Sequence, residues 1–506
     1  MSGRAEDREA ARDVTPWLEG YELVVGLEVH VELSTVTKMW CGCPTTFGDE
    51  PNTNVCAVCS GQPGALPVPN RRAVHDATLL GLALGGTIAP RCRFHRKNYF
   101  YPDLAKNYQI SQYDVPLVTE GRLEVEVERD GVVGTEVVGI ERLHMEEDTG
   151  KSLHLGATGR LHGADRSAID YNRSGVPLLE IVSHPDVRDP ETAQAYLREL
   201  QAIVRTLGVS DARMEEGSIR CDANVSVRRP GAPLGTRCEI KNLNSVRSLG
   251  RAIRFEAQRQ AQLLDDGGTV VMETRHWDEE AGVTRTLRRK ESVTDYRYFP
   301  DPDLVEMTTT PEAVERIRAE LPELPAAARA RLADAGVPRA QAATVLAGGM
   351  LGLLDAAVGA GATAPAVANW LAGEVTGQLA ARSSTLDASG LTGEHLAELV
   401  ALVDEGTLSA TMAKQVLTGV LDAGGADGPR AVAAAQGLEQ IGDDDALGAV
   451  IDEVVAANAE AVAAVRGGND RAIGALVGQV MRATQGRADP KRTNELLRAA
   501  IQASGD

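Results

Sequence analysis

The segment VVGLEVHVEL, residues 24–33, decides the fold of the first half of the chain. Its apolar residues alternate with Glu28, His30 and Glu32. Because successive side chains of a β-strand point to opposite faces, this alternation predicts a strand with one buried face and one polar face. Residues two apart on one face lie about 6.6 Å from each other, so the polar face places Glu28 and His30 where both can bind one cation.

The length and the charge of the chain restrict the class of protein. At 506 residues the chain is too long for one core, and roughly two to four domains are expected. The 72 acidic and 52 basic residues give a formal net charge of −20. That charge argues against non-specific nucleic-acid binding, so we expect no DNA partner, and any RNA recognition must rest on local patches and on shape.

The sequence shows no sign of a membrane segment. No apolar run approaches the ~20 residues that a membrane span needs, and the N-terminus lacks the apolar core of a signal peptide. We therefore expect a cytoplasmic protein that does not contact a membrane. Residues 1–20 are polar and mixed in charge, which favours a disordered tail.

A change of composition divides the chain. Of its eighteen aromatic residues, only Trp370 follows Phe299. Residues 21–300 mix strands, hairpins and helices, which predicts a mostly antiparallel α+β domain, whereas helical periods dominate afterwards. We expect a helical linker domain over 301–355 and a helical C-terminal domain over 356–506. Lysine and arginine residues cluster between 466 and 498, a pattern that fits RNA contact and a solvated helix face equally well.

Several elements of the α+β part can be placed. One helix is expected from Asn70 to Gly85, and another from about Asn244 or Ser245 to Gly267, because capping residues precede each helical period and glycines follow it. Asp130-Gly131 indicates the turn of a β-hairpin.

Four of the seven cysteines form two closely spaced pairs, Cys41 with Cys43 and Cys56 with Cys59. A tetrahedral zinc ion needs four such ligands, so the spacing predicts a structural zinc site, with chance clustering as the competing interpretation. In a cytosolic protein we expect free thiols or metal ligands rather than disulfides. The remaining cysteines are expected in the hydrophobic core: Cys92, Cys221 and Cys238.

Acidic residues on or beside predicted strands suggest a second metal site. They are Glu28 with His30, the run HMEED at 144–148, and Glu180. Carboxylates and an imidazole suit Mg²⁺ when phosphates complete its shell, although for any single acid a surface salt bridge is the competing interpretation.

Neither a GxxxxGK[ST] loop nor a GxGxxG turn is present in the sequence. A bound ATP would therefore be held by metal ions and basic side chains. The segment RKNYFYPDLAKNYQISQ, residues 96–112, is the best candidate because it interleaves Lys97 and Lys106 with aromatic residues. The competing interpretation is a small aromatic core with lysines that reach past it to solvent.

Together these segments resemble the B subunits of the bacterial tRNA-dependent amidotransferases, the GatB/GatE family. The resemblance covers nearly the whole chain after residue 20 and rests on motifs in the same order and spacing. They are VVGLEVHVEL, PGALPVPN, RKNYFYPDLAKNYQISQ, LHMEEDTGKS, VPLLEIVSHPD, MEEGSIRCDANVS, EIKNLNS, DYRYFPDPD, NWLAGEV and LVGQVMRATQGRADPKRTNELL.

The resemblance implies a ligase that forms carbon–nitrogen bonds. Such an enzyme uses ATP to convert Glu-tRNA(Gln), Asp-tRNA(Asn) or both into Gln-tRNA(Gln) and Asn-tRNA(Asn) through an acyl phosphate. The ammonia comes from glutamine hydrolysed by a partner amidase, and a small third protein completes the heterotrimer. The implied fold is a glutamine-synthetase-like catalytic cradle over 21–300, followed by the helical linker and a YqeY-like tail domain that contacts tRNA.

The resemblance also carries site residues over to this sequence. The implied Mg²⁺ ligands, with catalytic roles, are Glu28, His30, Glu147 and Glu180. Lys97 and Lys106 fall in the segment associated with the ammonia route, as gates or phosphate contacts. The zinc site that some members carry is matched by Cys41, Cys43, Cys56 and Cys59. One departure is the segment 153–170, which is longer than the family pattern and is expected to extend a hairpin loop.

Two other functions compete with this one. A zinc-stabilised, tRNA-binding scaffold without chemistry of its own would keep its activity when His30 is replaced. The archaeal relative specialised for glutamyl-tRNA carries an extra inserted domain, for which this chain has no room.

Overall fold

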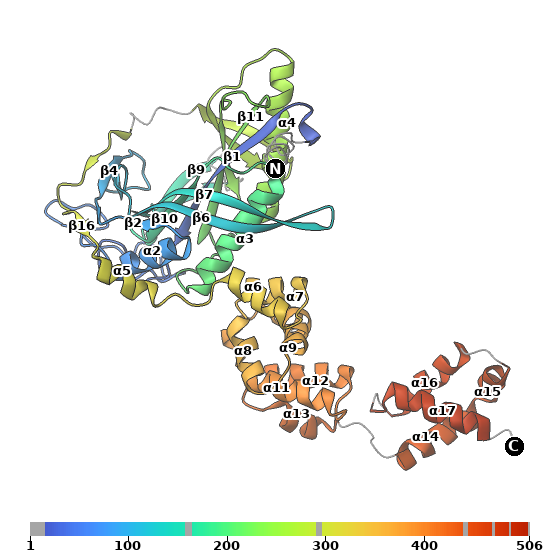
Figure 1. Ribbon diagram of the computed structural model, residues 1–506. Helices are drawn as coiled ribbons and strands as arrows, with labels where there is room; N and C mark the ends of the chain where they lie inside the picture. Colours follow the sequence, from blue (N-terminus) through green and yellow to red (C-terminus); the bar gives the residue numbers. More distant parts are fainter. Residues whose placement is uncertain are drawn as a thin grey trace. The chain divides into compact units, whose positions relative to one another are not determined.

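The computed structural model describes residues 16–156, 164–289, 296–438, 444–467, 471–484 and 487–503 (Figure 1). The chain divides into two compact units, Met1–Pro325 and Ala326–Asp506. Of the tail expected over residues 1–20, positions 1–15 lie outside the described residues, and Pro16–Leu18 form a short 3₁₀ helix, η1.

Within its described residues, the first unit is built on a nine-stranded sheet with the order β14-β13-β12-β11-β1-β10-β7-β6-β2. Every neighbouring pair is antiparallel except β12 and β13. The strands are β1 (Glu22–Glu32), β2 (Thr87–Ile88), β6 (Val118–Arg129), β7 (Val132–Glu147), β10 (Pro177–Ser183), β11 (Ile219–Arg228), β12 (Cys238–Leu243), β13 (Glu273–Asp278) and β14 (Val283–Arg289).

Three smaller sheets accompany this large one in the described part of the first unit. They consist of β4 (His95–Asn98), β5 (Tyr108–Ser111) and β15 (Phe299–Pro300); β3 (Arg91–Cys92) and β16 (Met307–Thr308); and β8 (Lys151–Gly156) and β9 (Ala164–Asp170). The pair β8–β9 is the hairpin expected around the long segment 153–170, and its residues 157–163 lie outside the described ones. The architecture is α+β.

Strand β1 lies in the middle of the large sheet, and the alternation expected for it is confirmed. Val25, Leu27, Val29 and Val31 are fully buried. They belong to the same core as buried residues of the helices α2 (Arg71–Ala83), α3 (Pro190–Thr206) and α4 (Val246–Asp265). Figure 1 shows α3 and α4 running alongside the sheet. The opposite face of β1 carries its polar residues.

Local signals in the sequence set the ends of these elements. The side chain of Asn70 accepts hydrogen bonds from the first turn of α2, and Ser245 caps α4 in the same way. Both predicted helix starts are confirmed. The turn between β6 and β7 has positive φ at Asp130 (53°) and Gly131 (77°), as the Asp-Gly pair predicts for a tight hairpin.

The first unit continues beyond residue 300, where the composition changes. Helix α5 (Pro311–Arg318) contacts α2, and Ile317, Leu321 and Leu324 pack against the core of the first unit. The structure therefore divides the segment 301–355, expected as one linker domain, at Pro325.

The described residues of the second unit are helical. Its helices are α6 (Pro325–Asp334), α7 (Arg339–Ala347), α8 (Leu351–Gly359), α9 (Ala364–Trp370), α10 (Thr376–Ala381), α11 (Gly393–Asp404), α12 (Ala410–Asp422), α13 (Pro429–Gln436), α14 (Asp444–Ala457), α15 (Ala459–Arg466), α16 (Arg471–Ala483) and α17 (Pro490–Ala503). They form two hydrophobic clusters, one between Leu332 and Ala433 and one between Leu447 and Ile501.

No single helix in the described part of the chain has the length and apolar character to cross a membrane. One bent pair, α7 with α8, meets the criteria of length and composition when the two helices are taken together.

The packing of β1 gives a first prediction. Replacing the fully buried Leu27 with alanine should lower the free energy of unfolding of the first unit by about 2–5 kcal/mol, because the core closes only partly around the lost side chain. Val132→Ala is the control, since Val132 is 70% exposed, and it should change stability by less than about 0.5 kcal/mol. Chemical denaturation followed by tryptophan fluorescence measures both. Equal effects of the two substitutions would contradict the assignment of the buried face.

Candidate functional site

The register of three neighbouring strands brings together the polar residues of the sheet. His30 of β1 lies directly opposite Glu180 of β10, which in turn lies opposite His144 of β7. Glu146 follows His144 by two residues and therefore lies on the same face. One ligand atom each from His30, Glu146 and Glu180 fall within 4.8 Å of one another, so these three side chains could hold a metal ion.

His30 is at the centre of this group. Its Nε2 lies 3.3 Å from Glu180 Oε2 and 3.7 Å from Glu146 Oε1. Ser111 of β5 donates a hydrogen bond of 3.2 Å to Glu146 Oε2, and this bond helps to fix the position of the Glu146 carboxylate. The arrangement joins residues more than a hundred positions apart in the sequence.

His144 is a fourth member of the group, and it was not among the individual residues expected there. Its Nε2 lies 3.5 Å from Glu180 Oε2 and 4.0 Å from Glu146 Oε2, and the residue is buried. The run HMEED contained the information needed to predict this. Residues 144 and 146 are two apart in a strand and therefore point to the same face, as residues 28 and 30 do.

The electrostatics of the group suit a cation. Burial opposes the charge of Glu180, but the imidazoles of His144 and His30 hold the pKa of its carboxyl well below the ordinary value. Burial also opposes the charge of His30, yet Glu180 and Glu146 raise its pKa. Glu180 is therefore ionised at neutral pH and able to coordinate a cation.

Lys97 faces the same carboxylates from β4. Burial disfavours its charge, but the attraction of Glu146 and Glu180, with that of nearby tyrosines, raises its pKa above the ordinary value. Its Nζ lies 5.2 Å from the centre of the Tyr296 ring, and Tyr298 stacks on Tyr113 beside it. Lys97 therefore brings a fixed positive charge to the group.

Glu147, expected to lie with His30 and Glu180, does not join them. Because Glu146 and Glu147 are consecutive in a strand, they point to opposite sides. The Glu147 carboxylate is buried in an ion pair with Lys106, whose Nζ lies 2.6 Å from Oε2, and it accepts a hydrogen bond of 3.0 Å from the backbone of Ile110. In the structure Glu146, and not Glu147, lies with His30 and Glu180.

Glu28 lies on the same sheet face as His30, but in a neighbouring cluster. Asn224 donates a hydrogen bond of 2.7 Å to its Oε1. Burial and the nearby Glu180 raise the pKa of Glu28. Beyond it, the ammonium of Lys241 pairs with Asp222 and, at 3.4 Å, with Glu239. The structure thus brings His30, Glu146 and Glu180 together and places Glu28 in a separate cluster next to them.

The four clustered cysteines also converge. Cys59 Sγ lies 3.6 Å from the sulfurs of Cys41 and Cys56 and 3.7 Å from that of Cys43. A tetrahedral zinc ion with bonds of about 2.3 Å to sulfur spaces its ligands about 3.8 Å apart, so the cluster fits such an ion. Hydrogen bonding from Cys41 is the main reason that the pKa of Cys59 is lowered to about 4. All seven cysteines are free, and the remaining three lie in the core as expected.

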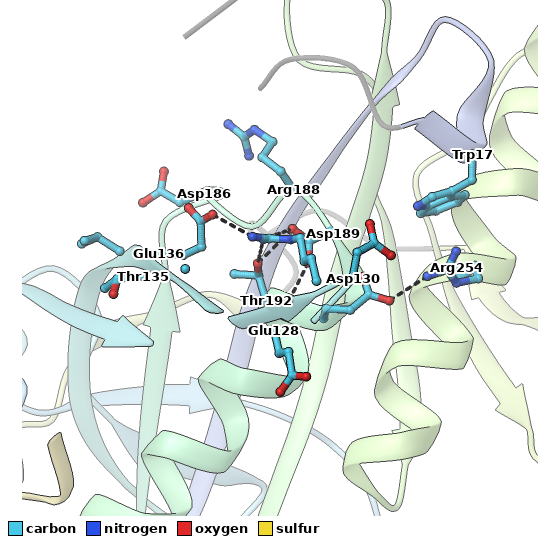
Figure 2. A pocket seen from close by; sticks show the side chains of 14 residues that line it. Trp17, Glu128, Asp130, Thr135, Glu136, Asp186, Arg188, Asp189, Thr192 and Arg254 are labelled. Carbon is cyan, nitrogen blue, oxygen red and sulfur yellow. Dashed lines mark hydrogen bonds and ion pairs between the residues drawn. The ribbon is translucent and has the colours of Figure 1, made fainter. Parts of the chain in front are cut away.

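A cavity of about 780 Å³ lies elsewhere in the first unit (Figure 2). The β6–β7 hairpin, the start of α3, Trp17 and Arg254 line it, and none of the expected site residues does. Several of its charges are paired: Arg129 binds Asp189 and Thr192, and Arg254 binds Glu191. The sheet-face group therefore remains the candidate site for chemistry.

Comparison with known proteins identifies relatives along nearly the whole chain. The family described as "GatB/GatE catalytic domain" matches residues 23–315, and that described as "GatB domain" matches residues 352–501. Proteins named as the B subunit of an aspartyl/glutamyl-tRNA(Asn/Gln) amidotransferase are similar to this chain. The one from Salinispora arenicola is 51% identical over 491 residues, which is 96% of this chain and 97% of the relative. The one from Frankia casuarinae is 52% identical over 494 residues, 95% of each chain.

The Lys106–Glu147 ion pair gives a second prediction. The two side chains are 4% and 1% exposed. Replacing Lys106 with methionine leaves an uncompensated buried carboxylate and should destabilise the first unit by about 3–5 kcal/mol. The double variant Lys106→Met/Glu147→Gln removes both charges and should recover most of that loss, as measured by chemical denaturation. A single variant as stable as the parent protein would show that the pair is not buried.

Proposed function

The chain belongs to the GatB/GatE family and is a subunit of a tRNA-dependent amidotransferase, and we propose that it carries the ATP-dependent step of that reaction on the face formed by His30, Glu146 and Glu180. The observation that carries this proposal is the convergence of two carboxylates and an imidazole from three neighbouring strands. Lys97 adds a positive charge beside the same two acids, which would also attract the phosphate groups of ATP.

The proposed reaction has two steps. The γ-phosphoryl group of ATP passes to the side-chain carboxylate of Glu-tRNA(Gln) or Asp-tRNA(Asn), which forms an acyl phosphate and releases ADP. Ammonia then attacks the carbonyl carbon, phosphate leaves, and the amide of Gln-tRNA(Gln) or Asn-tRNA(Asn) remains. Activation is needed because a free carboxylate offers no usable leaving group.

The residues of the group fit a divalent cation. Glu146 and Glu180 supply carboxylate oxygens and His30 supplies a nitrogen, and these ligand atoms lie within 4.8 Å of one another. A divalent cation there, Mg²⁺ in the family, would neutralise charge on the transferring phosphoryl group. The protein's own part is to hold Glu180 ionised and to direct the Lys97 ammonium at the phosphate oxygens.

Roles for the remaining expected residues follow from their positions. Glu28, beside the group, is proposed as a ligand for a cation bound together with the nucleotide phosphates. Lys106 and Glu147 lie on the other side of the strand end, which supports a place on the route of ammonia and not in the phosphoryl-transfer group.

We also propose that the cysteine cluster holds a structural zinc ion. The loop that carries it is tied to the segment between β9 and β10 by Lys38, whose ammonium donates to the carbonyls of Asn54 (2.7 Å) and Tyr171 (3.0 Å). The zinc site would thereby stiffen the segment that precedes Glu180.

The assembly and location are proposed from the family. A glutamine-hydrolysing amidase supplies ammonia, a small third protein completes a heterotrimer, and the complex works in the cytoplasm. The large, mostly antiparallel sheet with one polar face is consistent with the proposal of a glutamine-synthetase-like cradle over residues 21–300. The helical clusters of the second unit support the linker over 301–355 and the YqeY-like, tRNA-binding domain over 356–506.

Amidation of Glu-tRNA(Gln) by the reconstituted complex tests this function. Ammonium replaces glutamine, so the assay does not depend on the partner amidase. His30→Ala should lower the rate by at least about 100-fold, because a lost ligand is worth several kcal/mol of charge stabilisation, and it should leave tRNA binding intact. His154→Ala is the control, since His154 lies in the separate β8–β9 hairpin and is partly exposed. An unchanged rate for His30→Ala would support the scaffold function instead.

The zinc proposal has a separate test. Metal analysis of the purified chain should find about one zinc ion per chain, and Cys59→Ser should lose most of it together with thermal stability. Cys238→Ala is the matched control, because Cys238 is buried in the core far from the cluster in sequence. Full zinc content in the Cys59 variant would overturn the assignment.

A further inference from the structure

Exposed aromatic rings gather around the small sheet formed by β15, β4 and β5. In the described part of the chain five phenylalanine and tyrosine residues are exposed, and four of them lie on this sheet or within three residues of its strands. These four are 42–67% exposed: Phe100, Tyr101, Tyr113 and Phe299. Exposed apolar groups that cluster in this way mark a binding surface.

Tyr113 is the ring of this set with the most support from its surroundings. It stacks on Tyr298, with ring centroids 4.5 Å apart and 13° between the planes. The ring of His95 lies at 77° to it, with the centroids 6.1 Å apart. Stacking covers one face of the Tyr113 ring, while half of the residue's surface stays exposed. The ring is therefore already oriented for a second stacking partner.

The stacked pair adjoins the sheet-face group. Burial raises the pKa of Tyr298 to about 12. Lys97 opposes that rise in pKa, whereas Glu146 and Glu180 add to it, so these side chains lie close enough to act on the Tyr298 hydroxyl. Tyr113 thus lies one ring away from the residues proposed to carry the chemistry.

The substrate of the proposed reaction has an aromatic base close to its reacting group. In an aminoacyl-tRNA the amino acid is esterified to the ribose of the last nucleotide, and the 3′ end that carries this nucleotide is single-stranded. When the side-chain carboxylate of the amino acid reaches the sheet-face group, the terminal base must lie beside that group. Single-stranded bases bind proteins by stacking on exposed aromatic rings.

The charge of this region also favours RNA, although the whole chain is acidic. Residues 91–106 contain five lysine and arginine residues and one acidic residue, against a net charge of −20 for the chain. Several of these basic residues form ion pairs within the protein, but the balance of the segment stays positive. Several exposed rings suit consecutive bases of a strand better than the one adenine of ATP, because small-molecule sites enclose most of their ligand.

We propose that Tyr113 stacks against the terminal base of the aminoacyl-tRNA and thereby positions the amino acid at the sheet-face group. Tyr298 supports the Tyr113 ring from its other face. This inference rests on the proposed function, because it places the substrate of that same site.

Amidation kinetics of the reconstituted complex, with ammonium as the source of nitrogen, test this placement. Tyr113→Ala should raise the KM for Glu-tRNA(Gln) about 10-fold, a change of about 1.4 kcal/mol that matches the loss of one base stacked on an aromatic ring. The KM for ATP should stay unchanged. Tyr113→Phe keeps the ring and should keep both KM values. Leu287→Ala is the control, since Leu287 is 60% exposed on β14 at the edge of the large sheet.

A fluorescence measurement reports the stacking directly and does not depend on the alanine variant being folded. The probe is tRNA(Gln) with 2-aminopurine as its last base, saturated with the complex in the absence of ATP. Stacking on a ring should quench its fluorescence with the unaltered protein and with Tyr113→Phe, and Tyr113→Ala should abolish the quenching. Bound tRNA without quenching by the unaltered protein would overturn the proposal.

The outcomes separate this inference from the proposed function. An unchanged KM for Glu-tRNA(Gln) in Tyr113→Ala would refute the inference, as would a rise in the KM for ATP alone, which would assign the ring to the adenine of ATP. Either result leaves the function intact if His30→Ala still loses amidation. Full amidation by His30→Ala would refute the function, whereas quenching that depends on the Tyr113 ring would still support the stacking.

Discussion

The register between β1, β10 and β7 is the constraint on which the rest of the first unit depends. It places His30, Glu180 and His144 in one row across three strands. A slip of one residue would turn every side chain of a strand to the other face. The register is held because Val25, Leu27, Val29 and Val31 need the apolar core, and burying them fixes where the polar residues point.

This arrangement withdraws a set of charges from water. Glu146 and Glu180 are acidic side chains with little exposure, and unpaired they would cost several kcal/mol. The two imidazoles and the Lys97 ammonium offset that cost in the protein alone. When a cation binds, the carboxylates can pair with it in place of the imidazoles, and the Lys97 ammonium can pair with phosphate oxygens. The same buried charges therefore affect both the stability of the sheet and the proposed reaction.

Local signals in the sequence were sufficient for much of the fold. The alternation in 24–33, the caps Asn70 and Ser245 and the Asp-Gly turn each predicted an element correctly, because each acts within a few residues. The resemblance then supplied the family, which the comparisons confirm. The features that local signals could not predict depend on contacts distant in sequence. The packing of α5 on α2 carries the first unit past residue 300, and Lys106 draws Glu147 away from the group. Strict alternation from His144 would have selected Glu146.

The central claim is that phosphoryl transfer takes place on this sheet face, with Glu146 and not Glu147 as its acid from β7. Rapid-quench measurement of ADP formation tests it most directly, with the complex, ATP and Glu-tRNA(Gln) in the absence of glutamine and ammonium. The account predicts a burst of about one ADP per active site for the unaltered protein and for the charge-neutral double variant Lys106→Met/Glu147→Gln, and none for Glu146→Gln. A full burst from Glu146→Gln would contradict it.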